Sequence, residues 1–361
     1  MRSKLLVACV ALAVLAGCGG DDAADTTAAQ ATPAAAATDL GPIKDYLLEH
    51  SAKLKADTAT LAEDADAYYQ LAKSVDFDYA KLLADHREEV SEQLKGMQAT
   101  FREANPAYEQ MEGVVAGVPS LADYDVILDA GADKSDPENA VPFSIKTPAG
   151  KTFEQPGNFF FLLETSLWGT EDRFAAQGVK PDLDGDGTVE FGEALPDADF
   201  LVAAAKDFST NAADLDTSAN AWKPTEQDAF TALVVMTPTM SEYFEAWKNS
   251  RFVAGAKADE SGFVAASRLQ DIADILGGLV LVYDSIEPSV QQADEQQAAQ
   301  TGTDLKSLHE FAAKLRDEEA DGRKFTAQEA DTLGSDAQDR AEAIAGQVSQ
   351  AAGQLNIKLE S

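Results

Sequence analysis

The sequence predicts an all-α protein of long, antiparallel helices, and two observations carry this prediction. Beyond residue 41, apolar or small residues recur at alternating three- and four-residue steps, which places them on one face of an α-helix. Convincing alternating strand patterns are missing, although residues 141–153, with their Pro and Gly breaks, have room for one short hairpin. Helices of about 30 residues span about 45 Å, so the predicted bundles are elongated and pack along apolar seams.

The individual helices are predicted from the apolar stripes. One stripe runs from Leu47 to Ala72 and a second from Leu83 to Phe101, and Asn105-Pro106 is expected to end the second helix. Later stripes predict further helices within residues 230–247, 269–283, 305–315 and 337–355.

The folded part is long enough for two helical bundles. We assign residues 41–200 to the first bundle and residues 201–357 to the second. A polar, Gly-rich and acidic loop at residues 182–193 belongs to the first bundle and connects helices within it.

The first 18 residues have the pattern of a bacterial lipoprotein signal peptide. Arg2 and Lys4 supply a positive start, and Leu5–Leu15 form an apolar stretch too short to span a bilayer as a mature helix. Small residues precede Cys18, as lipoprotein signal peptidases require, so we expect the Cys18 thiol to carry the lipid. The alternative is an ordinary secretory leader in which Cys18 is incidental.

Export with a lipid anchor makes further predictions. Residues 19–40, rich in Ala, Thr and Asp, are a flexible tether between the lipid and the fold. The mature protein is expected outside the cytoplasm, anchored to a bacterial membrane, in the periplasm or on the cell surface. The two cysteines are Cys9 in the leader and Cys18, so the folded part has no disulfide, thiolate metal site or cysteine nucleophile.

The charge balance is strongly acidic. The chain has 28 Lys and Arg against 63 Asp and Glu, a net charge of −35, and loss of Arg2 and Lys4 with the leader makes it −37. Such a surface repels nucleic acid and favours cations, so we expect no nucleic-acid partner. Solubility or an acid-rich proteome explains the same charge.

Residues 182–193 have the ligand spacing of an EF-hand calcium loop. Such a loop needs oxygen ligands at positions 1, 3, 5, 7, 9 and 12 and Gly at position 6. Gly187 stands at the sixth position, and the predicted calcium ligands are Asp182, Asp184, Asp186, Thr188, Glu190 and Glu193. Pro181 and Pro196 flank the loop closely, so full helices on both sides are not expected. The alternative is an acidic surface loop with this spacing by chance.

Three further segments occur along the chain in the same order as similar segments of a known family. They are residues 104–129, which include Tyr-Glu-x-x-Glu and an acidic stretch, residues 161–169, which end in Leu-Trp-Gly, and residues 260–283. Together they resemble the imelysin-like family, which includes periplasmic iron-uptake proteins of the EfeO type, over most of residues 41–357. The resemblance implies an all-α fold of two helical bundles.

The sequence departs from the family pattern at one telling place. The family pattern is Gly-x-His-x-x-Glu, in which the His is associated with a metal. In this sequence Phe159 occupies the Gly position and Phe161 the His position, and only the Glu is retained, as Glu164. Carboxylates without imidazole prefer hard cations such as ferric iron, calcium or manganese. The resemblance therefore implies a degenerate metal site formed by Glu109, Glu112, Asp125 and Glu164. The alternatives are a lost site, and a structural hydrogen bond or salt bridge for Glu164 near Trp168.

The chain has few histidines with which to bind zinc. The chain has three, at His50, His86 and His309, and their scatter argues against a zinc site. His86 and Glu89 spell His-x-x-Glu, but His86 falls on an apolar stripe and is expected to be a partly buried structural residue.

These observations favour binding over catalysis. The sequence lacks the H-E-x-x-H, G-x-S-x-G and phosphate-loop patterns, so we expect no enzyme. The leading hypothesis is an envelope-anchored protein that binds iron or another hard cation for uptake, together with a membrane iron-transport component. The alternative is a calcium-stabilised surface scaffold or interaction lipoprotein that has lost the family metal site.

Overall fold

The computed structural model describes residues 38–360. The predicted signal peptide, the lipidation residue Cys18 and the tether as far as residue 37 lie outside the described residues. Within residues 38–360 the regular secondary structure is helical apart from one small hairpin, which confirms the all-α prediction. No helix in this range combines the length and the apolar character that a membrane span requires.

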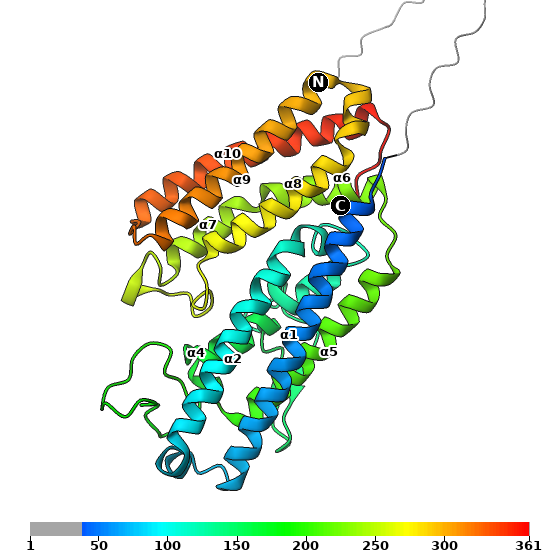
Figure 1. The fold of residues 1–361 in the computed structure, drawn as a ribbon. Coiled ribbons are helices and arrows are strands. Elements are labelled where there is room, and N and C mark those ends of the chain that lie inside the picture. The colour runs from blue at the N-terminus through cyan, green and yellow to red at the C-terminus, as the bar shows by residue number, and fades with distance from the viewer. Residues whose placement is uncertain (1–37, 361) are drawn as a thin grey trace, which may run out of the picture. The chain divides into compact units, whose positions relative to one another are not determined.

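A first group of helices packs around α1 (Gly41–Ser74). On one side lies α2 (Tyr79–Val115) and on another α5 (Ala198–Ala221), and the short helix α4 (Phe159–Trp168) contacts both α2 and α5 (Figure 1). The predicted stripe from Leu47 to Ala72 is the buried face of α1. Burial of this stripe against α2 and α5 is the main source of helix stability here.

Helix α2 does not end where the sequence predicted. It continues through Pro106 to Val115, because buried Ala107, Tyr108 and Met111 beyond the proline pack into the core. An interior proline costs a helix about 3 kcal/mol, and burial of several side chains outweighs this cost. The backbone leaves helical geometry instead at His86, with φ −137° and ψ 25°. As a result, Glu109 and Glu112 stand on a helix rather than in a loop.

A second group is formed by α6 (Glu226–Met236), α7 (Met240–Asn249), α8 (Arg268–Ala293), α9 (Glu295–Ala320) and α10 (Ala327–Gln354). Helix α8 packs on α9, and α10 packs on α7 and α9. Helix α8 also packs against α2, so the two groups share one hydrophobic core (Figure 1).

Short elements fill the connection between α2 and α5. Helix α3 (Ala122–Asp125) runs directly into η1 (Val126–Ala130), which is one turn of π-helix. Strands β1 (Ser144–Lys146) and β2 (Thr152–Glu154) pair antiparallel, with Ile145 opposite Phe153, where the sequence left room for a hairpin. Three short 3₁₀ helices follow along the chain: η2 (Asp172–Phe174) in the same connection, η3 (Thr237–Thr239) between α6 and α7, and η4 (Gly255–Lys257) between α7 and α8.

Candidate metal centre

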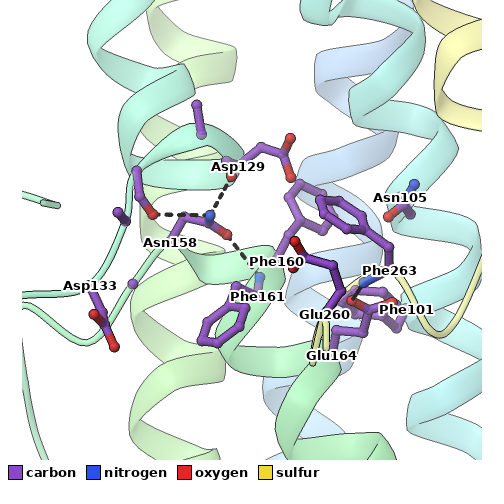
Figure 2. Close-up of a pocket in the computed structure, with 15 residues that line it drawn as sticks. Phe101, Asn105, Asp129, Asp133, Asn158, Phe160, Phe161, Glu164, Glu260 and Phe263 are labelled. Atoms are coloured by element: carbon purple, nitrogen blue, oxygen red, sulfur yellow. Dashed lines mark hydrogen bonds between the residues drawn. The ribbon is translucent and has the colours of Figure 1, made fainter. Parts of the chain in front are cut away.

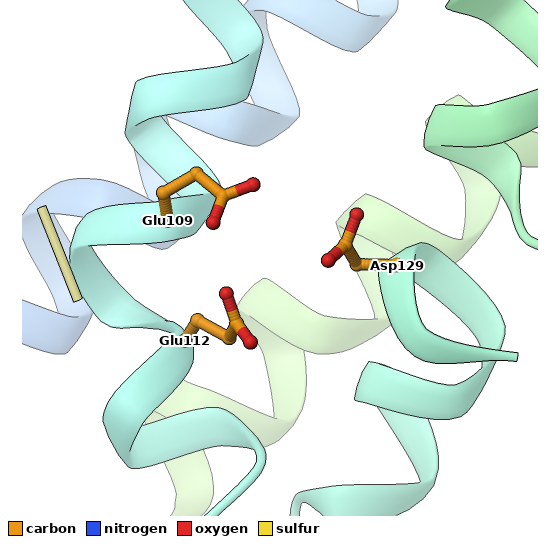
Figure 3. A group of neighbouring side chains, drawn as sticks. All are labelled: Glu109, Glu112 and Asp129. Atoms are coloured by element: carbon orange, nitrogen blue, oxygen red, sulfur yellow. The ribbon is translucent and has the colours of Figure 1, made fainter. Parts of the chain in front are cut away.

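Three carboxylates from two elements face one another inside the fold. Glu109 and Glu112 are three residues apart on α2, so they share one face of that helix. Asp129 reaches them from the π-helical turn η1 (Figure 3). One oxygen of each lies within 4.8 Å of one oxygen of each other residue. Glu109 is only 1% exposed and Glu112 only 3%.

Each glutamate of this group has one oxygen in use and one without a partner. Glu112 Oε1 accepts a hydrogen bond of 2.7 Å from the Tyr243 hydroxyl, and Glu109 Oε1 lies 3.4 Å from Asn105 Nδ2. Glu109 Oε2 and Glu112 Oε2 are buried and have no hydrogen-bond partner among the described residues. A buried carboxylate oxygen without a partner is costly, unless a proton or a cation neutralises it.

Helix α8 adds a positive and a negative group to the cluster. Arg268 Nη1 lies 3.0 Å from Asp271 Oδ2 and 3.5 Å from Glu109 Oε1, and Nη2 lies 3.8 Å from Asp129 Oδ2. The Arg268 guanidinium also lies over the rings of Tyr243 and Phe263, at 4.5 Å and 4.3 Å. A single guanidinium cannot balance all the acidic groups, so the cluster stays negative when they ionise.

The predicted ligand Asp125 lies beside the three-carboxylate group and has its own partner. Its Oδ1 accepts a hydrogen bond of 2.6 Å from the buried Tyr108 hydroxyl. Burial raises the pKa of Asp125 to about 7, and the nearby charge of Glu112 adds to the rise. Burial likewise raises the pKa of Glu109 and of Asp129 well above their ordinary values. A cation entering the cluster would therefore displace protons.

The predicted ligand Glu164 is satisfied by backbone rather than placed in the three-carboxylate group. From α4, it accepts hydrogen bonds from the amides of Phe263, Val264 and Ala265 at 2.6, 2.8 and 2.7 Å. Burial raises the pKa of Glu164 to about 7, although these three amides pull it down. Glu164 thus ties α4 to the segment that leads into α8.

A cavity of about 250 Å³ connects Glu164 with the cluster. Its wall includes Asp129, Asn105, Phe161 and Glu260 (Figure 2). Phe161 therefore faces the same cavity as Glu164.

Sequence reasoning missed Asp129, Arg268 and Asp271 as members of this cluster. Asp129 follows Asp125 by four residues, a spacing that brings both onto one side of a helical turn and that could have identified it. Arg268 and Asp271 also share one helix face. No local pattern, however, shows that this part of α8 packs against the part of α2 that contains Glu109.

The loop at residues 182–193 lies apart from this cluster, on the surface. Its Gly187 has φ +97° and donates its amide to Asp182 Oδ2 at 3.2 Å, and Glu193 accepts from the amides of Leu183 and Asp184 at 2.9 and 3.1 Å. Carboxylate oxygens of Asp182, Asp184 and Glu193 lie within 4.8 Å of one another, as do those of Asp184, Asp186 and Glu190. Thr188 donates its amide to Asp186. The loop has no full helix on either side, as expected from its prolines.

His86 belongs to neither group of acids. It is partly exposed on α2, and its Nδ1 lies 3.3 Å from Glu89 Oε2.

Comparison with known proteins agrees with this architecture. The model of a family described as Imelysin matches residues 43–350, and that model carries the name of a peptidase family. No curated protein matches the chain. The match includes both groups of helices and every buried acidic residue described above, so the resemblance drawn from three short segments is confirmed.

Proposed function

Because the chain belongs to the imelysin family, we propose that it binds iron or another hard cation, with Glu109, Glu112 and Asp129 as the ligands. The observation that carries this proposal is that two buried oxygens, Glu109 Oε2 and Glu112 Oε2, have no hydrogen-bond partner within residues 38–360. Oxygen ligands without imidazole or thiolate prefer hard cations. Tyr243 orients Glu112 from outside the ligand group, as such partners commonly do in metal sites.

The proposal includes the place where the protein acts. A lipid on Cys18 would hold the mature protein to a bacterial membrane, in the periplasm or on the cell surface, where it passes the cation to a membrane transport component. The support for this is the leader pattern of residues 1–18, together with a net charge of −35 that attracts cations.

We further propose that the chain binds without hydrolysing peptides, although its family model carries a peptidase name. A zinc peptidase needs two histidines near a catalytic glutamate, and the sequence has no H-E-x-x-H string. The carboxylates and phenols of the buried cluster supply oxygen atoms that suit binding of a cation.

Calorimetric titration of the mature protein tests the metal proposal. Ferric iron, supplied as its nitrilotriacetate complex, is expected to bind at one tight site. Glu112→Gln is expected to weaken this binding at least about tenfold, because loss of even an outer-shell partner of a metal ligand costs about tenfold in affinity. Glu103→Gln is the matched control, since Glu103 lies on the same helix with a side chain that is 71% exposed. Equal losses in both variants would show that the acidic surface, rather than the cluster, binds the metal.

We propose calcium as a second ion, held by the loop at residues 182–193 through Asp182, Asp184, Asp186, Thr188, Glu190 and Glu193. Two observations support this proposal. Carboxylates from separate positions of the loop lie close together, and Gly187 has a positive φ that a residue with a side chain would adopt only with strain. If calcium binds and ferric iron does not, the alternative role of a calcium-stabilised scaffold or interaction lipoprotein is favoured over uptake.

A further inference from the structure

The cavity beside the acidic cluster has walls that a bare metal ion does not need. Four phenylalanine rings line it, from Phe101, Phe160, Phe161 and Phe263 (Figure 2). Its volume is about 250 Å³, whereas a cavity of about 150 Å³ already holds benzene. A ligand with one ring and a short side chain therefore fits this cavity in size and in polarity.

The charged groups on the cavity wall are all carboxylates, and two of them already have close partners. Asp133 is paired with Arg173 at 2.9 Å, and Glu164 accepts three backbone amides. Glu260 has no ion pair among the described residues, and Asp129 lies 3.8 Å from Arg268 Nη2, beyond hydrogen-bond distance, so both can still face a ligand. An anionic ligand would be repelled here, whereas a cationic group would gain charge-assisted hydrogen bonds.

A side chain of the protein itself shows the same chemistry at the edge of the cavity. The Arg268 guanidinium is an organic cation held by carboxylates and covered by the rings of Tyr243 and Phe263. Phe263 lines the cavity as well. Aromatic rings next to carboxylates are a favourable environment for a cation with an apolar body.

We propose that this cavity binds a small organic ammonium ion, with its nitrogen at Asp129 and its apolar body among Phe101, Phe160 and Phe161. This site goes beyond metal binding and does not depend on it, because the three-carboxylate group contributes only Asp129 to the cavity wall.

The test compares ligands of one shape and different charge by calorimetric titration of the metal-free protein. The probes are 2-phenylethylamine, the neutral 2-phenylethanol and the anionic phenylacetate. The amine is expected to bind at least about tenfold more tightly than the alcohol, because a hydrogen bond to a charged group adds that much. Phenylacetate is expected not to bind. Equal affinities for amine and alcohol would overturn the proposal.

Two variants locate the amine. Ala132 lines the cavity, and Ala132→Leu fills part of it, so amine affinity should fall at least about tenfold while ferric binding stays unchanged. Ala149→Leu, at an exposed turn, is the matched control. Asp129→Asn should remove the preference for amine over alcohol.

The outcomes separate this inference from the proposed function. Unchanged amine binding in both Ala132→Leu and Asp129→Asn would overturn the amine site. If the unmodified protein does not bind ferric iron but still prefers the amine to the alcohol, only the metal proposal is overturned.

Discussion

Glu112 and Glu164 are both buried carboxyl groups, yet the fold gives them different surroundings. Glu164 meets three amide donors and Glu112 meets one phenol, so the acceptor capacity of Glu112 is only half used. A carboxylate that is fully hydrogen-bonded holds backbone in place, whereas one with a free buried oxygen can accept a cation. Which of these two roles a glutamate has depends on its neighbours in space.

Substitution of Glu164 should therefore change stability. Glu164→Ala leaves the amides of Phe263, Val264 and Ala265 without an acceptor, and we expect the free energy of unfolding to fall by about 2–4 kcal/mol. Glu164→Gln should cost less, because two of these amides bond one oxygen that an amide side chain can supply. Urea denaturation followed by circular dichroism measures both. A loss no larger than that of exposed Glu103→Ala would contradict this role.

At the scale of elements, the predicted and the observed chain differ most in α2. The periodicity located the helix, but Pro106 suggested an end that tertiary packing overrides. The loop at residues 182–193 behaves in the opposite way, since its residues and glycines determine a local turn that its own side chains hold. Local chemistry therefore predicts the loop well, whereas the length of a helix depends on what covers it.

Calcium should stabilise the protein through this loop. At a calcium concentration of about ten to a hundred times the dissociation constant, binding adds about 1–3 kcal/mol, so the melting temperature should rise by several degrees. Asp182→Ala should abolish the rise, because Asp182 is the first ligand of the loop. Thermal melts with calcium and with chelator measure this. Asp85→Ala, at an exposed helical position, should keep the full rise, and a rise in Asp182→Ala would refute the site.

At the scale of the whole molecule, the acidic cluster joins the two groups of helices. Glu109 and Glu112 come from α2, Asp129 comes from η1, and Arg268 and Asp271 come from α8. Since α2 and α8 pack against each other, charge in this cluster acts on the contact between the groups. Protonation or cation binding is therefore expected to affect global stability.

The metal-free protein should lose stability as pH rises from about 5 to about 8. Burial raises the pKa of Asp125 and of Glu164 to about 7, above their ordinary values of 3.8 and 4.5. The folded state thus holds protons that the unfolded chain has released, and the stability they contribute is complete below pH 4 and lost as pH passes 7. Thermal melts across this range measure the decline. Glu164→Gln should show a shallower decline, and an identical slope would contradict the assignment.

The sequence by itself determined the helical class, the positions of the long helices other than α5, the family resemblance and the EF-hand-like spacing of residues 182–193, because these depend on local periodicity and on short motifs. Through the resemblance it also indicated candidate metal ligands, namely Glu109, Glu112, Asp125 and Glu164. Only the tertiary structure decided that Glu109 and Glu112 meet Asp129, that Glu164 binds backbone amides, and that Arg268 lies among the acids. The physical reason is that contacts between α2, η1 and α8 depend on how the helices pack, and no local pattern contains that information.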